Sequence, residues 1–162
     1  MWYIPDRGAR MIINYMSPVK GEQFDVSKAS DDVFSQGLLG SGFVIHPTDH
    51  YIYAPIDGVI SMIFPTKHAI AIKHASGIAV LIHIGFNTVD LKGNGFILHA
   101  ALHQVVKQGD LILEFDDDYV RKHASSLDTS VIFMQKDFIH VHTSNMIDEH
   151  VYMEIEVETH DS

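Results

Sequence analysis

Short apolar runs, rather than long periodic stretches, dominate the sequence. They are rich in Val, Ile and Phe, they end at Gly, Pro, Asp or Ser, and they span residues 43–46, 51–54, 58–64, 69–73, 78–84, 111–115, 131–134 and 151–157. The last run, VYMEIEV, alternates apolar and polar side chains as a strand with one buried face does. Many short strands with frequent turn signals indicate a β-sandwich or a barrel, and hence an all-β fold.

Other stretches qualify this pattern without changing the fold class. Residues 118–127 are compatible with a short helix, and residues 98–106 fit either a turn of helix or a strand. No linker divides the chain, so we predict one domain over residues 11–162 after a flexible tail of residues 1–10. Two small-Pro-x-x-Gly segments, SPVKG at 17–21 and APIDG at 54–58, suggest an internally duplicated architecture.

Composition narrows the function classes. The 162 residues are 46% hydrophobic and 20% charged, which is typical of a globular protein. No apolar run is long enough to span a membrane, and no signal-peptide pattern is present. The net charge of −10 argues against nucleic acid and anionic membranes as partners. With 0 cysteines the chain has no disulfide or thiol chemistry, and we expect a cytoplasmic protein.

Two of the 12 histidines flank a predicted turn at residues 74–77. With a two- or four-residue loop and Gly77 in the left-handed conformation, His68 and His83 are directly opposite each other on one face of the hairpin. A three-residue loop shifts the register by one and places them on opposite faces. The residues leave three interpretations open: a structural pair, part of a metal site that needs a further ligand, or phosphoryl transfer. In phosphoryl transfer, one nitrogen of the first ring attacks phosphorus while a carbonyl accepts a hydrogen bond from the other nitrogen of that ring. The neighbouring ring, as imidazolium, neutralises the charge of the phosphoryl group.

Ordered motifs around this pair resemble the glucose-type IIA family of the bacterial sugar phosphotransferase system. The resemblance runs from about Ile13 to Val157, and its motifs are PT at 47–48, APIDG at 54–58, TKHA at 66–69, LIHIGFNTVDLKGNGF at 81–96, GD at 109–110 and EFD at 114–116. It implies an antiparallel β-sandwich with a few short helices. It also implies that His83 is phosphorylated at Nε2, that His68 assists the transfer and that Thr66 orients the pair.

The resemblance also implies partners and a surface that binds them. The phosphoryl donor is the phosphohistidine of the carrier HPr. The acceptor is a cysteine of a IIB domain, which we expect on a separate chain because this one has no cysteine. No cofactor is implied, although His68 and His83 could serve as adventitious or intermolecular zinc ligands. The apolar rim that docks partners corresponds to Val33, Phe34, Leu38, Leu39, Ile84 and Val89, any of which could instead be core, and Asp137 aligns with an acidic residue near the site.

Two positions depart from the family pattern. Asn87 stands where the family usually has Asp, four residues after His83, and a lost carboxylate there would alter the choice of partner. His103 stands where Gly is frequent, and His tolerates a positive φ better than most residues do.

Three other functions compete with the phosphocarrier. The serious one is a mainly regulatory IIA-like protein that binds enzymes or permeases according to its phosphorylation state. A zinc peptidase of the lysostaphin type would need a His-x-x-x-Asp motif beside the His-x-His at 140–142, and residues 46–49 are one residue short of it. A biotinyl or lipoyl carrier would need its lysine in a characteristic turn, which surrounds none of Lys67, Lys73 and Lys92.

Overall fold

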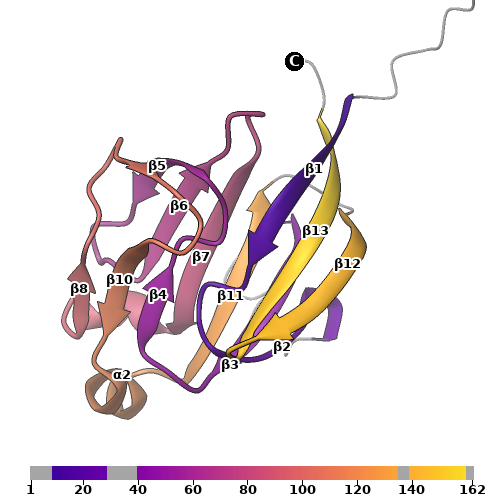
Figure 1. Cartoon of the computed structure of the whole chain (residues 1–162). Helices are drawn as coiled ribbons and strands as arrows, with labels where there is room; N and C mark the ends of the chain where they lie inside the picture. Colours follow the sequence, from indigo (N-terminus) through magenta and orange to yellow (C-terminus); the bar gives the residue numbers. More distant parts are fainter. Residues whose placement is uncertain (1–8, 29–39, 135–138, 160–162) are drawn as a thin grey trace, which may run out of the picture.

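The strands of the described residues form one seven-stranded and two three-stranded sheets, and all paired strands are antiparallel (Figure 1). The structure is a computed structural model that describes residues 9–28, 40–134 and 139–159. It confirms the predicted all-β sandwich. The large sheet has the order β2 (Gly21–Asp25), β3 (Gly40–Pro47), β11 (Ser126–Met134), β7 (Ala79–Phe86), β6 (Ala69–Lys73), β5 (Gly58–Ile63) and β9 (Val105–Val106). The first small sheet has the order β1 (Ala9–Met16), β13 (His150–Thr159) and β12 (Ile139–Ile147). The second small sheet has the order β4 (Tyr51–Tyr53), β10 (Leu111–Phe115) and β8 (Phe96–Leu98).

The main hydrophobic core lies between the large sheet and both small sheets. Successive side chains of a strand point to opposite faces, so each strand of the large sheet contributes alternate residues to this core. In β7, Val80, Ile82 and Ile84 belong to it, whereas Leu81 and His83 project from the opposite face. We call that opposite side the outer face. It carries a second, smaller apolar cluster made of Val44, Ala69, Ala71, Leu81, Phe86 and Ile132.

The two small-Pro-x-x-Gly segments lie against each other in the core. The N–H of Met16, just before the first segment, donates to the carbonyl of Pro55 at 2.9 Å. The N–H of Tyr53, at the same place before the second segment, donates to the carbonyl of Pro18 at 2.7 Å. Such reciprocal pairing of equivalent positions is the arrangement that an internal duplication predicts.

The helices are short. Those in the described part of the chain are η1 (Val26–Lys28), η2 (Thr88–Leu91) and α2 (Asp117–His123). Asp116 caps α2 by accepting a hydrogen bond from the N–H of Tyr119 at 3.0 Å, which fixes where the helix begins. The helix ends four residues before the predicted Leu127, because β11 already begins at Ser126. No helix in the described part of the chain is long and apolar enough to cross a membrane.

Two further boundaries differ from the sequence prediction. Residues 98–106 are neither one helix nor one strand, because a turn separates the end of β8 from the start of β9. In that turn His103 has a φ of 72°, so the histidine does adopt the left-handed conformation expected there. At the N-terminus β1 begins at Ala9, so the predicted tail of residues 1–10 extended too far into the chain; residues 1–8 lie outside the described residues.

Candidate active site

His83 lies on the outer face of the large sheet. Its neighbour on β6 is Ala69 and its neighbour on β11 is Ser130, and each is directly opposite it in the strand register. Directly opposite residues of antiparallel strands share a face, with Cβ atoms about 4.5–5.5 Å apart. The His83 side chain is therefore enclosed by the outer-face row of the sheet, and only 7% of its surface is exposed.

The register of the β6–β7 hairpin differs by one residue from the predicted one. Lys73 pairs with Ala79, so the loop contains five residues rather than two or four, although Gly77 does have a positive φ of 93°. His83 is consequently opposite Ala69 and not opposite His68. The two histidines nevertheless meet, with ring centroids 4.9 Å apart and an angle of 81° between the ring planes. His68 is in a bend just before β6, where the regular alternation of side chains does not apply.

Gly85 fixes the orientation of the His83 ring. Its carbonyl oxygen lies 3.0 Å from Nδ1 of His83 and accepts the Nδ1 hydrogen of the neutral ring, which leaves the lone pair on Nε2. Gly85 has a φ of 71°, and a Cβ there would lie 2.6 Å from the carbonyl oxygen of Ser126 and 2.7 Å from Cγ2 of Thr88. Only glycine fits this combination of conformation and space, so the carbonyl is placed by the backbone itself.

His68 is held by two neighbours in the turn that precedes β6. Its Nδ1 lies 2.6 Å from the hydroxyl oxygen of Thr66. The ring of Phe64 packs edge-to-face against it at a centroid distance of 5.4 Å. In the tautomer that carries its hydrogen on Nε2, Nδ1 accepts from this hydroxyl and a neutral His68 can act as a hydrogen-bond donor.

Burial favours the neutral form of both rings. Burial and, to a smaller extent, the nearby His68 together lower the pKa of His83 to about 4, against the opposing effect of the hydrogen bond to Gly85. Burial also lowers the pKa of His68, partly offset by a hydrogen bond to the backbone of Thr66. A neutral imidazole is the nucleophilic form, so His83 presents a ready lone pair at Nε2 beside a second ring that can donate.

Comparison with known proteins places this arrangement in a family. The model of the family "phosphoenolpyruvate-dependent sugar phosphotransferase system, EIIA 1" matches residues 13–139. The chain belongs to this family. It is 45% identical over 130 residues to the glucosamine-specific EIICBA component of the same system from Bacillus subtilis (strain 168), covering 78% of this chain and 21% of the relative. The chain therefore spans about a fifth of that relative's length.

A solved EIIA structure has the same fold. Glucose permease IIA from Mycoplasma capricolum superposes with a TM-score of 0.72 at 32% sequence identity, covering 99% of this chain and 96% of that one. The resemblance that the sequence motifs indicated is thus confirmed at the level of both family and fold.

The expected EIIA partner rim is only partly visible. Asn87 has a φ of 61° and is exposed, and its amide donates to the hydroxyl of Ser125. Ile84 is fully buried in the main core, so it does not belong to an exposed rim and its alternative assignment as core packing is the correct one. Val89 lies in η2, but its side chain is not among those described. The remaining rim residues, Val33, Phe34, Leu38, Leu39 and Asp137, lie outside the described residues.

Two residues that support the histidine pair were missed from the sequence. Reasoning from the residues required some carbonyl to hold the nucleophile, but did not identify Gly85. A histidine followed two residues later by glycine was the available signal, because a kink at that point returns the carbonyl toward the ring. No comparable signal marks Phe64, whose contact with His68 depends on the turn geometry.

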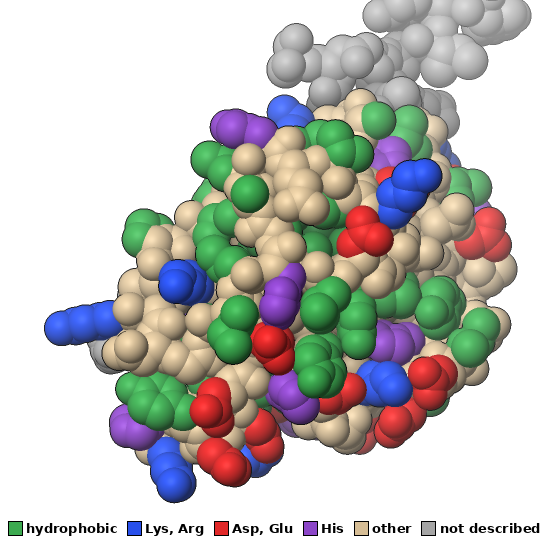
Figure 2. Space-filling model, turned by 60° about the vertical axis from the view of Figure 1, so that its left-hand side comes forward, with side chains coloured by type: hydrophobic (Ala, Val, Ile, Leu, Met, Phe, Trp, Pro, Cys, Tyr) green, Lys and Arg blue, Asp and Glu red, His purple; other side chains and the backbone are tan. Residues whose placement is uncertain are grey.

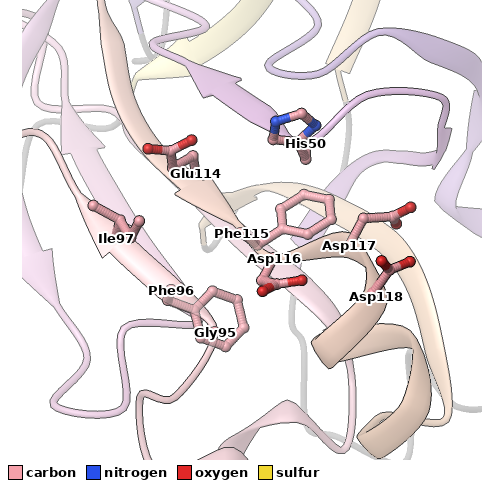
Figure 3. Close-up of a pocket in the computed structure, with 9 residues that line it drawn as sticks. All are labelled: His50, Gly95, Phe96, Ile97, Glu114, Phe115, Asp116, Asp117 and Asp118. Carbon is pink, nitrogen blue, oxygen red and sulfur yellow. The ribbon is translucent and has the colours of Figure 1, made fainter.

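A separate hollow lies between α2 and the strands β8 and β10. Figure 2 turns this side of the molecule forward, and acidic side chains gather at its lower end near α2. Figure 3 shows the hollow, whose lining includes neither histidine of the pair and consists of His50, Gly95, Phe96, Ile97, Glu114, Phe115, Asp116, Asp117 and Asp118.

Proposed function

We propose that the protein is a cytoplasmic phosphocarrier that accepts a phosphoryl group from phospho-HPr on His83 and passes it to a IIB domain. Membership of the EIIA 1 family supports this class of activity. The observation that carries the assignment of the residue is the buried, neutral His83, whose Nδ1 is fixed by Gly85 and whose ring lies beside that of His68.

Acceptance requires one bond to form as another breaks. The lone pair on Nε2 of His83 bonds to phosphorus while the bond from phosphorus to the donor's histidine nitrogen breaks, and that electron pair returns to the donor ring. The hydrogen stays on Nδ1 and is donated to the Gly85 carbonyl throughout, so the positive charge that develops on the ring is stabilised by this hydrogen bond.

His68 acts on the phosphoryl group without bonding to it. Its ring lies 4.9 Å from that of His83, which is within reach of a group attached to Nε2 of the latter. With Thr66 holding Nδ1, the Nε2 hydrogen of His68 can be donated to a phosphoryl oxygen. This donation supports the onward step, in which a cysteine thiolate of IIB attacks phosphorus and the electron pair of the P–N bond returns to His83. The acceptor thiol must lie outside these 162 residues, which include 0 cysteines.

Phosphorylation by the general enzymes of the system tests this proposal. With phosphoenolpyruvate, the first enzyme of the system and HPr, we expect one phosphate per chain. His83→Ala should abolish labelling, whereas His140→Ala, on a different sheet, should be labelled like the wild type. Stoichiometric label in the His83→Ala protein would remove His83 from the proposed role.

A mainly regulatory role is the second candidate. It is favoured by Asn87, because its amide is engaged with Ser125 at a place where the family usually presents a carboxylate to partners. Phosphate transfer from the labelled protein to a IIB domain separates the two roles. A carrier loses its phosphate to the IIB domain as soon as the two proteins are mixed, whereas a regulator that has lost its transport role keeps the phosphate on its own chain.

A further inference from the structure

Ser130 is a buried hydroxyl without a partner. Its Oγ is the one buried side-chain oxygen or nitrogen in the described part of the chain that makes no hydrogen bond, and the residue has 0% exposure. Buried polar groups are nearly always paired, and leaving one unpaired costs stability. The position therefore calls for an explanation.

The strand register places this hydroxyl beside the candidate nucleophile. Ser130 is directly opposite His83 on one side and opposite Val44 on the other. Directly opposite side chains share a face, so Ser130 and His83 are adjacent in the outer-face row. The flanking members of that row, Ala69 and Val44, are apolar and cannot pair with a hydroxyl. Within the row, His83 is thus the polar neighbour of Ser130.

A phosphoryl group on His83 would supply what the hydroxyl lacks. It brings several negatively charged oxygens to a site that holds only neutral rings, and hydrogen bonds to charged acceptors are the strong ones. A serine hydroxyl is a neutral donor that can rotate to meet such an oxygen.

We propose that the Ser130 hydroxyl donates a hydrogen bond to an oxygen of the phosphoryl group carried by His83, and so stabilises the phosphorylated form. This inference rests on the proposed function of His83. Ser130 forms no covalent bond, and its hydrogen stays on Oγ throughout. Its hydroxyl is unsatisfied in the resting protein and satisfied in the phosphorylated protein, which shifts the phosphoryl equilibrium from HPr toward this chain.

The equilibrium between phospho-HPr and the phosphorylated chain tests the proposal. Ser130→Ala removes the hydroxyl at nearly constant volume. We expect it to shift the equilibrium about tenfold toward HPr, the size of effect of one hydrogen bond to a charged group. The melting temperature of the unphosphorylated variant should equal or exceed that of the wild type, because an unpaired buried hydroxyl has been removed.

Thr129→Val is the matched control on the same strand. Thr129 is also fully buried, but it faces the opposite side of the sheet, and its hydroxyl donates to the carbonyl of Leu127 at 3.1 Å. This variant should be less stable, because a hydrogen bond is lost, yet its equilibrium with phospho-HPr should match that of the wild type. If the role of Ser130 were purely structural, Ser130→Ala would behave like Thr129→Val: it would be less stable, and its equilibrium with phospho-HPr would be unchanged.

The possible outcomes separate this inference from the proposed function. An equilibrium within twofold of the wild type in Ser130→Ala, with His83 still labelled, would overturn the role of Ser130 and leave that of His83 intact. A lower melting temperature of unphosphorylated Ser130→Ala would also overturn it. If the wild type itself takes no label on His83, the proposed function is wrong and the inference about Ser130 falls with it.

Discussion

Two pairs of histidines in this protein have nearly the same ring geometry and opposite surroundings. In the outer-face pair, His68 and His83 have centroids 4.9 Å apart and ring planes at 81°. In β12, His140 and His142 have centroids 4.8 Å apart and planes at 86°. The first pair is buried, whereas both rings of the second are exposed to solvent.

The difference lies in what holds each ring. Each Nδ1 of the outer-face pair has its own neighbour, the Gly85 carbonyl for His83 and the Thr66 hydroxyl for His68. In the β12 pair, Nε2 of His142 is 3.3 Å from a carboxylate oxygen of Glu156, which also lies near Arg10. Nε2 of His142 is therefore held by an acidic side chain rather than facing a second buried ring. Under the proposed function, we therefore expect phosphoryl chemistry at the buried pair, whose rings are oriented by Gly85 and Thr66, and not at the exposed pair.

The largest expected effect within this comparison is on the onward step. His68→Gln keeps a hydrogen-bond donor but loses the imidazole, and we expect transfer to IIB to fall roughly 100-fold while acceptance from HPr is largely kept. His142→Gln is the matched change in the exposed pair and should leave both steps unchanged. Single-turnover transfer rates measure the two steps separately. Equal loss of both steps in His68→Gln would indicate a structural pair instead.

Displacing the carbonyl that holds His83 should have the next largest effect. In Gly85→Ala the new Cβ would clash with the Ser126 carbonyl, so the backbone must shift. We expect acceptance from HPr to fall about tenfold and stability to fall by about 2–3 kcal/mol.

Gly77→Ala controls for backbone strain alone. Gly77 also has a positive φ, but its Cβ would meet nothing within 4 Å. This variant should lose about 1 kcal/mol of stability and no transfer rate. Parallel losses of rate in both variants would show that strain, rather than the position of the carbonyl, affects transfer.

The neutral state of His83 predicts a loss of stability in acid. Its pKa of about 4 in the folded protein lies below the ordinary 6.5, so the unfolded chain binds more protons between these values. This contribution is complete above pH 6.5 and is lost as the pH falls toward 4.

Unfolding in denaturant at pH 7 and pH 5 measures this contribution. We expect the wild type to lose about 1–2 kcal/mol more stability than His83→Gln over this interval. His142→Gln should lose as much as the wild type, since His83 is retained. Identical acid sensitivity of the wild type and His83→Gln would mean that burial does not keep His83 neutral.

The smallest expected effect concerns recognition beside the pair. Asn87→Asp adds a carboxylate that can still accept a hydrogen bond from Ser125, so the local structure should survive. If HPr presents basic residues around its histidine, transfer from it should speed up by a few-fold at low salt, with a gain that shrinks as salt rises. Stopped-flow transfer rates over a salt series measure this gain. A slower variant would indicate a less basic partner surface.

The sequence predicted the strands that bury one full face and missed those that do not. The run 69–73 and the alternating run 151–157 both coincide with strands, β6 and β13, that contribute to the core. β12 was missed because it is an edge strand whose side chains are mostly exposed, so its sequence IHVHTSNMI has no buried periodicity. β1 was not among the predicted strands and its first two residues fell in the predicted tail; Met11 and Ile12 are both exposed, which breaks the alternation at its start.

The sequence identified the residues that meet around the histidine pair, but its register for the β6–β7 hairpin was wrong. Family motifs identified His68, His83 and Thr66, and the structure brings these three side chains together. Loop length could not be read from residues 74–78, and the five-residue loop moved the register by one. Ser130 has no sequence signal, because its position opposite His83 exists only once β11 pairs with β7.

Nitrogen NMR of the histidine rings, before and after phosphorylation, tests the central claim most directly. In the unphosphorylated protein near pH 7, His83 should be neutral with its hydrogen on Nδ1, as the Gly85 contact requires. After phosphorylation, the phosphorus should be bonded to Nε2 of His83, with Nδ1 still protonated and the rings of His140 and His142 unchanged. A phosphate on Nδ1 of His83, or on either histidine of the exposed pair, would contradict the account.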